Sequence, residues 1–387
     1  MNEKSLQSSS TIENGLSINS IFLSLIVVMI TLMSFSSIIE NSVIKPRLYD
    51  GSINELGRYS MTFDAYQHIE SESENSIIAI GSSKMREAFD GITIGDLFDN
   101  TYDFYNLALA GDRPYVRMLE IEALINAKPK YVILEVGPNT FSYLSTPVPD
   151  STLSRMAHLS SLGQVDLQSY PESVLNVSDY DLLPNDYFSQ KNHIASYSLD
   201  AIENTIDFEI FDEEKPWSCG GKRANVRCVP LPQNSSFDDY LRYPIQFSNT
   251  IERIKSGAMM KWSIDEFYGE MLDKYINGSY HNPEGHKNKN QVSFEYMINE
   301  FENAGISVVL VGLPYNPVLI DRLQPGQWDY YNQSINTYIE EHKFVVFDML
   351  WDEDWEELHF NDYTHMSREG EMLFAEKFFV QLSDVME

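Results

Sequence analysis

Three apolar runs, each followed at once by small or polar residues, constrain the fold of this 387-residue chain most strongly. The runs and the residues after them are 77–80 with Gly81-Ser82-Ser83, 106–110 with Gly111, and 131–136 with Gly137-Pro138-Asn139. Apolar runs of this length are typical of strands buried on both faces of a parallel sheet. The carboxyl ends of parallel strands meet at one edge of the sheet, where open α/β folds bind ligands. We therefore expect these three segments to lie in one site.

Helical patterns alternate with the strands. We expect strands at 77–80, 104–109, 131–136, 306–311 and 344–347, and helices at 84–89, 114–127, from 291 to Gly305, at 330–341 and from 369 onward. This alternation predicts an α/β fold with a parallel sheet.

The alternation stops after residue 140 and resumes near residue 291. We interpret 141–290 as an inserted cap between the third and fourth strands, which separates the first half of the core (76–140) from its second half (291–387). Aromatic residues in the cap could stack on sugar rings, although burial in a core is the more common role of such residues. They are Trp217, Tyr240, Tyr243, Trp262, Phe267 and Tyr268.

A fourth polar segment, Asp362-Tyr363-Thr364-His365, lies near the C-terminus. A serine hydroxyl is a poor nucleophile unless a base removes its proton during attack on an acyl carbon. His365 is the best candidate for this base, because the pKa of a histidine lies near neutral pH and Asp362 could orient the ring. The oxyanion that forms then needs hydrogen-bond donors.

The four segments, in this order, resemble the SGNH (GDSL-like) hydrolase family, which takes its name from a Ser, a Gly, an Asn and a His. The resemblance implies a flavodoxin-like, three-layer α/β fold. It makes Ser83 the nucleophile, His365 the acid and base, and Asp362 its partner, with an oxyanion hole formed by Ser83, Gly111 and Asn139. The chain has Ser82 and Thr140 where the family usually has Asp. Both variants are familiar from divergent, membrane-associated members that act on cell-surface glycans.

The function that the resemblance implies is that of an esterase or O-acyltransferase without a cofactor, acting on the acyl or acetyl ester of a surface glycan or lipid. A non-catalytic binding or scaffold module of a glycan-modification system is the alternative. A metal site is a third interpretation, with His359, Asp362 and His365 or His281 and His286 as ligands. Neither set has the helical His-x-x-x-His spacing, so we expect no metal.

The charge of the chain bears on its partners. Its formal net charge is −31. Nucleic-acid binding needs clustered Lys and Arg, which are absent here, so nucleic acid is not an expected partner. The oligomeric state is left open.

The segment 21–39 contains no charge and is almost wholly apolar. A run of this length is sufficient for a transmembrane helix. We therefore expect a single membrane anchor between a polar tail (1–20) and a linker (40–75); a cleaved signal peptide is the alternative.

The two cysteines and the Asn-x-Ser sequons favour a large domain outside the cytoplasm. Cys219 and Cys228 flank a short glycine-rich loop, which suits a disulfide, while two unpaired thiols are the alternative. The sequons begin at Asn176, Asn234, Asn277 and Asn332.

Overall fold

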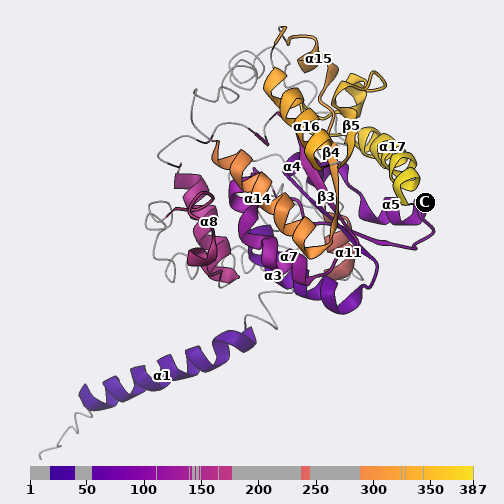
Figure 1. Cartoon of the computed structure of the whole chain (residues 1–387). Helices are drawn as coiled ribbons and strands as arrows, with labels where there is room; N and C mark the ends of the chain where they lie inside the picture. The colour runs from indigo at the N-terminus through magenta and orange to yellow at the C-terminus, as the bar shows by residue number, and fades with distance from the viewer. Residues whose placement is uncertain are drawn as a thin grey trace, which may run out of the picture. The chain divides into compact units, whose positions relative to one another are not determined.

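A computed structural model describes residues 18–39, 55–176, 237–244 and 288–386, except 110, 139, 142–143, 145–147, 149, 164, 324, 327 and 343. The chain divides into two compact units, Met1–Arg47 and Leu48–Glu387. The second unit contains the sheet and is shown with the first in Figure 1.

The sheet has five parallel strands in the order β2-β1-β3-β4-β5. The strands are β1 (Ser76–Ile80), β2 (Asp103–Asn106), β3 (Tyr131–Val136), β4 (Ser307–Gly312) and β5 (Val345–Asp348). Ile77 of β1 pairs with Tyr131 of β3, and Tyr131 pairs in turn with Ser307 of β4. This strand order is consistent with a flavodoxin-like fold, in which ligands bind beyond the carboxyl ends of the strands.

Helices connect the strands of the described part. The first half of the core contains α3 (Glu55–Glu72), α4 (Ser83–Ala88), α5 (Gly91–Leu97), α6 (Pro114–Arg117), η2 (Met118–Glu120) and α7 (Ile121–Asn126). The next elements are α8 (Asp150–Leu162), η3 (Leu167–Ser169) and α11 (Phe237–Arg242). The second half contains α14 (Lys289–Ala304), α15 (Pro317–Ile320), α16 (Asp329–His342), η6 (Met349–Trp351), η7 (Glu357–His359) and α17 (Arg368–Met386).

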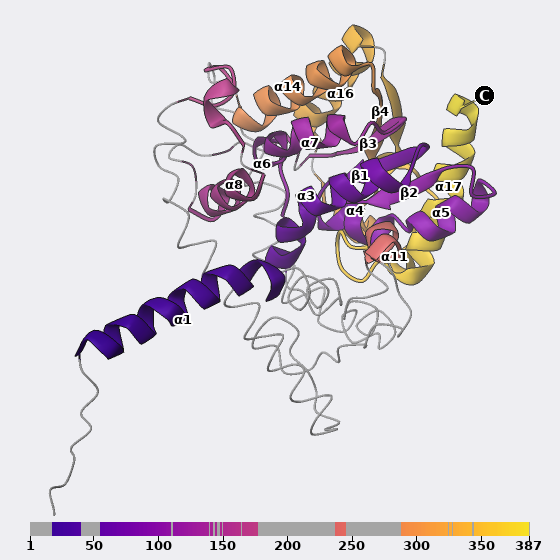
Figure 2. The same cartoon turned by 90° about the horizontal axis from the view of Figure 1, so that it is seen from below.

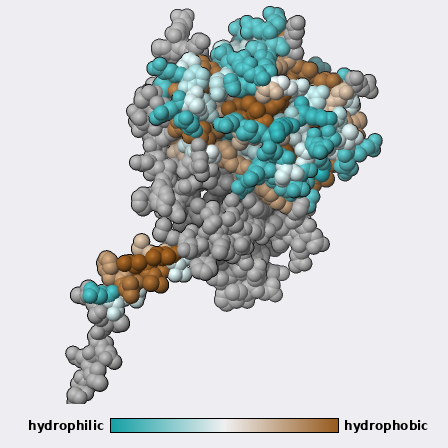
Figure 3. Space-filling view, turned by 60° about the horizontal axis from the view of Figure 1, so that its bottom comes forward, coloured by the Kyte–Doolittle hydropathy of each residue, from teal (hydrophilic) through white to brown (hydrophobic). Residues whose placement is uncertain are grey.

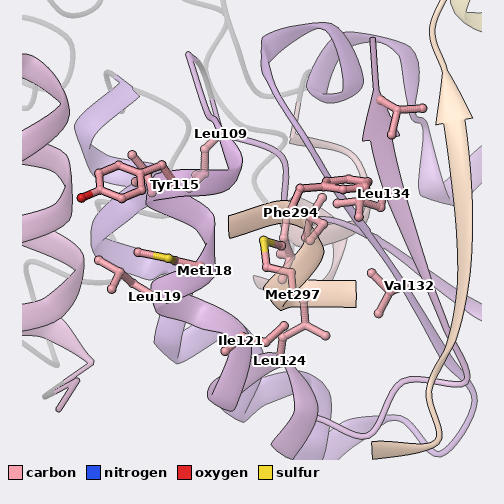
Figure 4. Close-up of a cluster of buried hydrophobic side chains, with 14 of the residues drawn as sticks. Leu109, Tyr115, Met118, Leu119, Ile121, Leu124, Val132, Leu134, Phe294 and Met297 are labelled. Carbon is pink, nitrogen blue, oxygen red and sulfur yellow. The ribbon is translucent and has the colours of Figure 1, made fainter. Parts of the chain in front are cut away.

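The sheet lies between two layers of helices, and each layer covers one apolar cluster. Alternate residues of a strand point to opposite faces, so Ile78 and Ile80 belong to one cluster and Ile77 and Ala79 to the other. Helices α14, α16 and α7 lie on one side and α17 and α5 on the other (Figures 1 and 2). Figure 4 shows part of the first cluster, where Phe294 and Met297 of α14 lie beside Leu134 of β3. The predicted three-layer α/β arrangement with a parallel sheet is thus confirmed.

The largest differences from the expected element boundaries lie in three places. The second strand ends at Asn106 rather than at 109, although the amide of Leu107 still donates to the carbonyl of Ala79 at 2.8 Å. The single helix expected over 114–127 is divided by the 3-10 turn η2. Helix α3 covers much of the segment interpreted as linker, because Ala65, Tyr66 and Ile69 pack into the first cluster.

Helix α1 (Ile18–Ile39) belongs to the first unit. Its large apolar side chains from Ile21 to Ile30 are exposed and form the brown segment at the lower left of Figure 3. Among the residues that the structure describes, no helix meets the length and hydropathy that a membrane crossing needs, so the anchor predicted over 21–39 is not found.

Most of the expected cap (141–290) lies outside the described residues, and so do Cys219, Cys228, Asn234 and Asn277. The described parts of the cap pack on the core. Tyr170 donates its hydroxyl to the carbonyl of Met118 at 3.1 Å, and Asp238 of α11 accepts from Tyr105 of β2 at 2.9 Å. Of the aromatic residues considered for sugar stacking, Tyr240 and Tyr243 are buried.

Candidate active site

The segment 81–83 turns from strand β1 into helix α4, and Ser83 is the first residue of that helix. Ser82 is the N-cap, because its hydroxyl accepts from the amide of Lys84 at 3.2 Å. Gly81 has no room for a side chain: a Cβ there would lie 2.5 Å from Oε2 of Glu135 and 2.9 Å from Cβ of Met85. The turn therefore places Ser83 at the carboxyl edge of the sheet.

The C-terminal segment brings a histidine and a carboxylate to this serine. Nε2 of His365 lies 2.8 Å from Oγ of Ser83, and Nδ1 of His365 lies 2.7 Å from Oδ2 of Asp362. The other carboxylate oxygen of Asp362 accepts from the backbone amides of Thr364 and His365, each at 2.8 Å. One carboxylate thus fixes both the turn and the imidazole, which is the arrangement of a Ser-His-Asp triad.

The pKa values of the pair show which proton distribution the site favours. Burial lowers the pKa of His365, but the negative charges of Glu87 and Asp362 and the hydrogen bond to Asp362 raise it to about 9 overall. Burial raises the pKa of Asp362, but the charge and hydrogen bond of His365 and the two backbone amides bring it below its usual value. The site therefore stabilises an imidazolium beside a carboxylate, the charge state that forms when His365 accepts the serine proton.

Contacts from the loop after β4 hold the segment 360–366 in place. Asn316 donates its side-chain amide to the carbonyl of Asp362 at 3.2 Å and its backbone amide to the carbonyl of Tyr363 at 3.1 Å. Within the segment, the amide of Asn361 donates to the carbonyl of His365 at 2.8 Å. The position of His365 is therefore set by β4 as well as by its own turn.

Gly111 lies in the loop after β2, two residues beyond Leu109, whose amide donates to the carbonyl of Gly81 at 2.9 Å. Its φ is +65°, a left-handed conformation that favours glycine. Arg155 of α8 donates to the carbonyl of Gly111 at 2.8 Å, and a Cβ on Gly111 would lie 2.7 Å from Nη1 of Arg155. Because Gly111 has no side chain, the guanidinium of Arg155 can lie this close to its backbone.

A buried ion network holds the next residue of this loop. Nε of Arg117 lies 2.7 Å from Oδ2 of Asp112, and the guanidinium also donates to the carboxylate of Glu120 at 2.5 Å and to the carbonyl of Leu107 at 3.1 Å. Tyr66 of α3 donates to Glu120 at 2.9 Å. The loop that contains Gly111 is therefore anchored to three elements of the core.

The third expected oxyanion donor, Asn139, lies outside the described residues. The residue two positions before it is Gly137, and a Cβ there would lie 3.4 Å from Nζ of Lys84. The end of β3 thus lies next to helix α4. The oxyanion roles of Ser83, Gly111 and Asn139 stay predictions.

Sequence reasoning missed Asn106, the last residue of β2. Its side-chain amide donates to the carbonyls of Met85, Arg86 and Phe89 at 3.3, 3.0 and 2.7 Å. Its Oδ1 accepts from the amide of Ala108 at 3.2 Å. A fully buried asparagine therefore ties the end of α4 to the strand beside β1.

Sequence reasoning also missed a buried charged pair beneath the serine turn. Glu135 of β3 accepts from the amide and the hydroxyl of Ser82, at 2.6 and 2.9 Å. Nζ of Lys84 lies 3.2 Å from Glu135 and donates to the hydroxyl of Tyr315 at 3.0 Å. The available signal was Glu135 itself, a charged residue within the apolar run 131–136.

The residues considered as metal ligands make other contacts where the structure describes them. Nδ1 of His359 accepts from the amide of Glu356 at 2.9 Å and so caps a helical turn. Asp362 and His365 belong to the triad, and His281 and His286 lie outside the described residues. Within the described part of the chain, no group of His, Cys, Asp and Glu is placed to hold a metal ion.

Comparison of the sequence with protein-family models found no match, and a search of curated proteins found no significant match.

Proposed function

We propose that the chain is a serine-dependent acyl-transfer enzyme, an esterase or an O-acyltransferase, that forms an acyl-enzyme on Ser83. One observation carries the proposal: the hydrogen-bond chain from Asp362 through His365 to Ser83, with distances of 2.7 and 2.8 Å. A serine and a base within hydrogen-bond reach, with the base oriented by a third group, are the requirements for an activated nucleophile.

The proposed reaction has two halves. Oγ of Ser83 attacks the ester carbonyl carbon while Nε2 of His365 accepts the hydroxyl proton, and the tetrahedral intermediate collapses as His365 returns the proton to the leaving alcohol. In the second half His365 takes a proton from the acceptor, which attacks the acyl-enzyme, and then returns that proton to Ser83. Water as acceptor makes the protein an esterase, and a sugar hydroxyl makes it an O-acyltransferase.

The substrate class is part of the proposal and follows from the resemblance to SGNH hydrolases. We propose an acyl or acetyl ester of a surface glycan or lipid, with the site outside the cytoplasm. Product analysis with and without an added glycan acceptor separates the two activities, because release of free acid alone in both reactions would exclude the transferase.

The test is covalent labelling of the full-length protein by a fluorophosphonate, at pH 7 and pH 9. Native protein should acquire one adduct on Ser83, and Ser83→Ala and His365→Ala should abolish labelling because they remove the nucleophile and its base. Ser71→Ala, which removes an exposed serine of α3, is the matched control and should label like the native protein.

An adduct on another serine would contradict the proposal. At pH 9, His365 is neutral in about half of the molecules. A folded native protein that acquires no adduct at this pH would favour a non-catalytic binding module instead.

A further inference from the structure

The carboxylate of Glu135 binds the residue that precedes the candidate nucleophile. It accepts two hydrogen bonds from Ser82, one from the backbone amide at 2.6 Å and one from the hydroxyl at 2.9 Å. Two bonds to one residue restrict its rotation more than one bond does. Because Ser82 is followed directly by Ser83, the orientation of Ser82 sets the start of helix α4 and the direction of the Ser83 side chain.

The carboxylate and the turn are also packed as one unit. A Cβ on Gly81 would lie 2.5 Å from Oε2 and 2.6 Å from Cβ of Glu135, distances that side chains do not tolerate. The strand β3 and the turn after β1 are therefore in direct contact at the point where the chain leaves the sheet. A shift of the Glu135 side chain would move the turn.

Lys84 completes the arrangement on the other side of Ser83. The side chains of Lys84 and Glu135 are each about 5% exposed, and Nζ of Lys84 lies 3.2 Å from the carboxylate. Nζ also donates to the hydroxyl of Tyr315 at 3.0 Å and lies 4.4 Å from the centre of its ring. Burying a charge is costly, and the pair offsets that cost because each charge has the other as its partner.

We propose that Glu135 is a positioning residue for the candidate nucleophile, and that together with Lys84 it holds the residues on both sides of Ser83. The inference rests on the proposed function. The resembled family usually has an aspartate at the position of Ser82, and here a carboxylate reaches that position from the neighbouring strand. A displacement of about 1 Å in a reacting group costs on the order of a hundredfold in rate, so a carboxylate that fixes the turn affects the chemistry without contacting the substrate.

The test is the rate of fluorophosphonate labelling per folded molecule in full-length Glu135→Gln, measured at pH 9 together with the thermal midpoint. We expect labelling to be about ten- to a hundredfold slower, because the glutamine side chain is uncharged and has only one oxygen to accept the two bonds from Ser82. The matched control is Glu371→Gln, a buried glutamate of α17 paired with Arg368 at 2.7 Å, which should change stability without changing the labelling rate.

A second variant separates positioning from a general loss of packing. Ser82→Asp places two carboxylates in contact and should slow labelling. In the double variant Ser82→Asp with Glu135→Gln, the carboxylate of the new aspartate faces the side-chain amide of the new glutamine, so one carboxylate remains at this contact. The double variant should therefore label faster than either single variant. A rate in the double variant equal to or below the slower single variant would overturn the inference.

The outcomes of this test and of the previous one are distinct. Native protein that acquires no adduct on Ser83 removes the proposed function, whereas native labelling with an unchanged rate in folded Glu135→Gln removes only the positioning role. Should Glu135→Gln fail to fold, Ser82→Asp decides, because aspartate keeps the N-cap of α4 but cannot donate a hydrogen bond to Glu135. Slower labelling of folded Ser82→Asp supports the role, and an unchanged rate overturns it.

Discussion

At the scale of single residues, the candidate site depends on how charge is distributed around one imidazole. Oγ of Ser83 lies 2.8 Å from Nε2 of His365, although the two residues are 282 positions apart in the sequence. The negative charges of Glu87 and Asp362 outweigh the effect of burial and raise the pKa of His365 to about 9. Since a general base must be unprotonated, this charge environment stabilises the product of proton transfer and also limits the fraction of active base at neutral pH.

The first prediction concerns the pH dependence of labelling. The rate of fluorophosphonate labelling should rise with pH through a midpoint near 9, because only neutral His365 accepts the serine proton. Glu87→Gln removes one of the charges that raise this pKa and should shift the midpoint of the profile to lower pH. A profile series over pH 6 to 10 measures both effects.

The control for this prediction is Glu302→Gln. It also removes one negative charge, but from α14 beside His342, and should leave the midpoint of the pH profile unchanged. A midpoint that does not move in Glu87→Gln would contradict the assignment of the charge effect to this residue.

At the scale of elements, helix α4 is short and owes its position to contacts at both ends. It has six residues, from Ser83 to Ala88, and isolated helices of this length are not stable in water. Its start is capped by Ser82, and the carbonyls near its end accept from the buried side-chain amide of Asn106. The placement of the serine therefore depends on β2 as well as on β1.

The second prediction follows from this contact. Asn106→Leu removes the side-chain donor to the carbonyls of Arg86 and Phe89 at the end of α4, and each buried group that loses its partner costs about 1–3 kcal/mol. We expect the free energy of unfolding in urea to fall by about 3 kcal/mol. Labelling should also become slower in the molecules that stay folded, because the end of α4 is no longer tied to β2.

Asn332→Ala is the matched control, since the side chain of Asn332 makes an exposed hydrogen bond with Trp351 at 3.3 Å. Its unfolding free energy should stay within about 0.5 kcal/mol of the native value. Equal losses in the two variants would refute the role assigned to Asn106.

At the scale of the whole molecule, a net charge of −31 coexists with carboxylates that the fold buries. Burial raises the pKa of Glu120 to about 7 despite the opposing charge of Arg117, and burial likewise raises the pKa of Glu371 to about 7. A carboxyl group whose pKa is higher in the folded state than in the unfolded state favours folding when it is protonated. Its contribution is therefore present at low pH and is lost as the pH rises from about 4.5 to about 7.

The third prediction is that the protein is most stable at mildly acidic pH. Between pH 4.5 and 7 the folded state binds more protons than the unfolded state at Glu120 and Glu371, so stability falls as the pH rises. His365 acts in the same direction at higher pH, because its stabilising proton is lost through about pH 9. Each unit of pKa shift corresponds to about 1.4 kcal/mol. Thermal unfolding of the full-length protein from pH 4.5 to 9 measures the trend.

Glu371→Gln should flatten the decline between pH 4.5 and 7, because glutamine does not titrate. Added salt should raise the midpoint most at high pH, where self-repulsion of the negative charge is largest. A midpoint that rises steadily from pH 4.5 to 8 would contradict this prediction.

The sequence by itself determined the elements whose signals are local. The apolar runs at 77–80 and 131–136 form buried strands because their side chains avoid water on both faces of the sheet. Gly305 ends α14 in a left-handed conformation, as its position after a helical stripe predicts. The pairing of Asp362 with His365 was predictable for the same reason, because a turn of four residues is a local structure.

Only the tertiary structure revealed the residues of other strands that hold the serine turn and helix α4. The contacts of Glu135 with Ser82 and of Asn106 with α4 join elements that no local pattern connects. Helix α3 is a further example: its segment was interpreted as a linker from the sequence, and only the structure shows that Tyr66 and Ile69 pack against the core. Burial and hydrogen bonding between elements depend on how the sheet is assembled, and that assembly follows from the free energy of the whole chain rather than from any single segment.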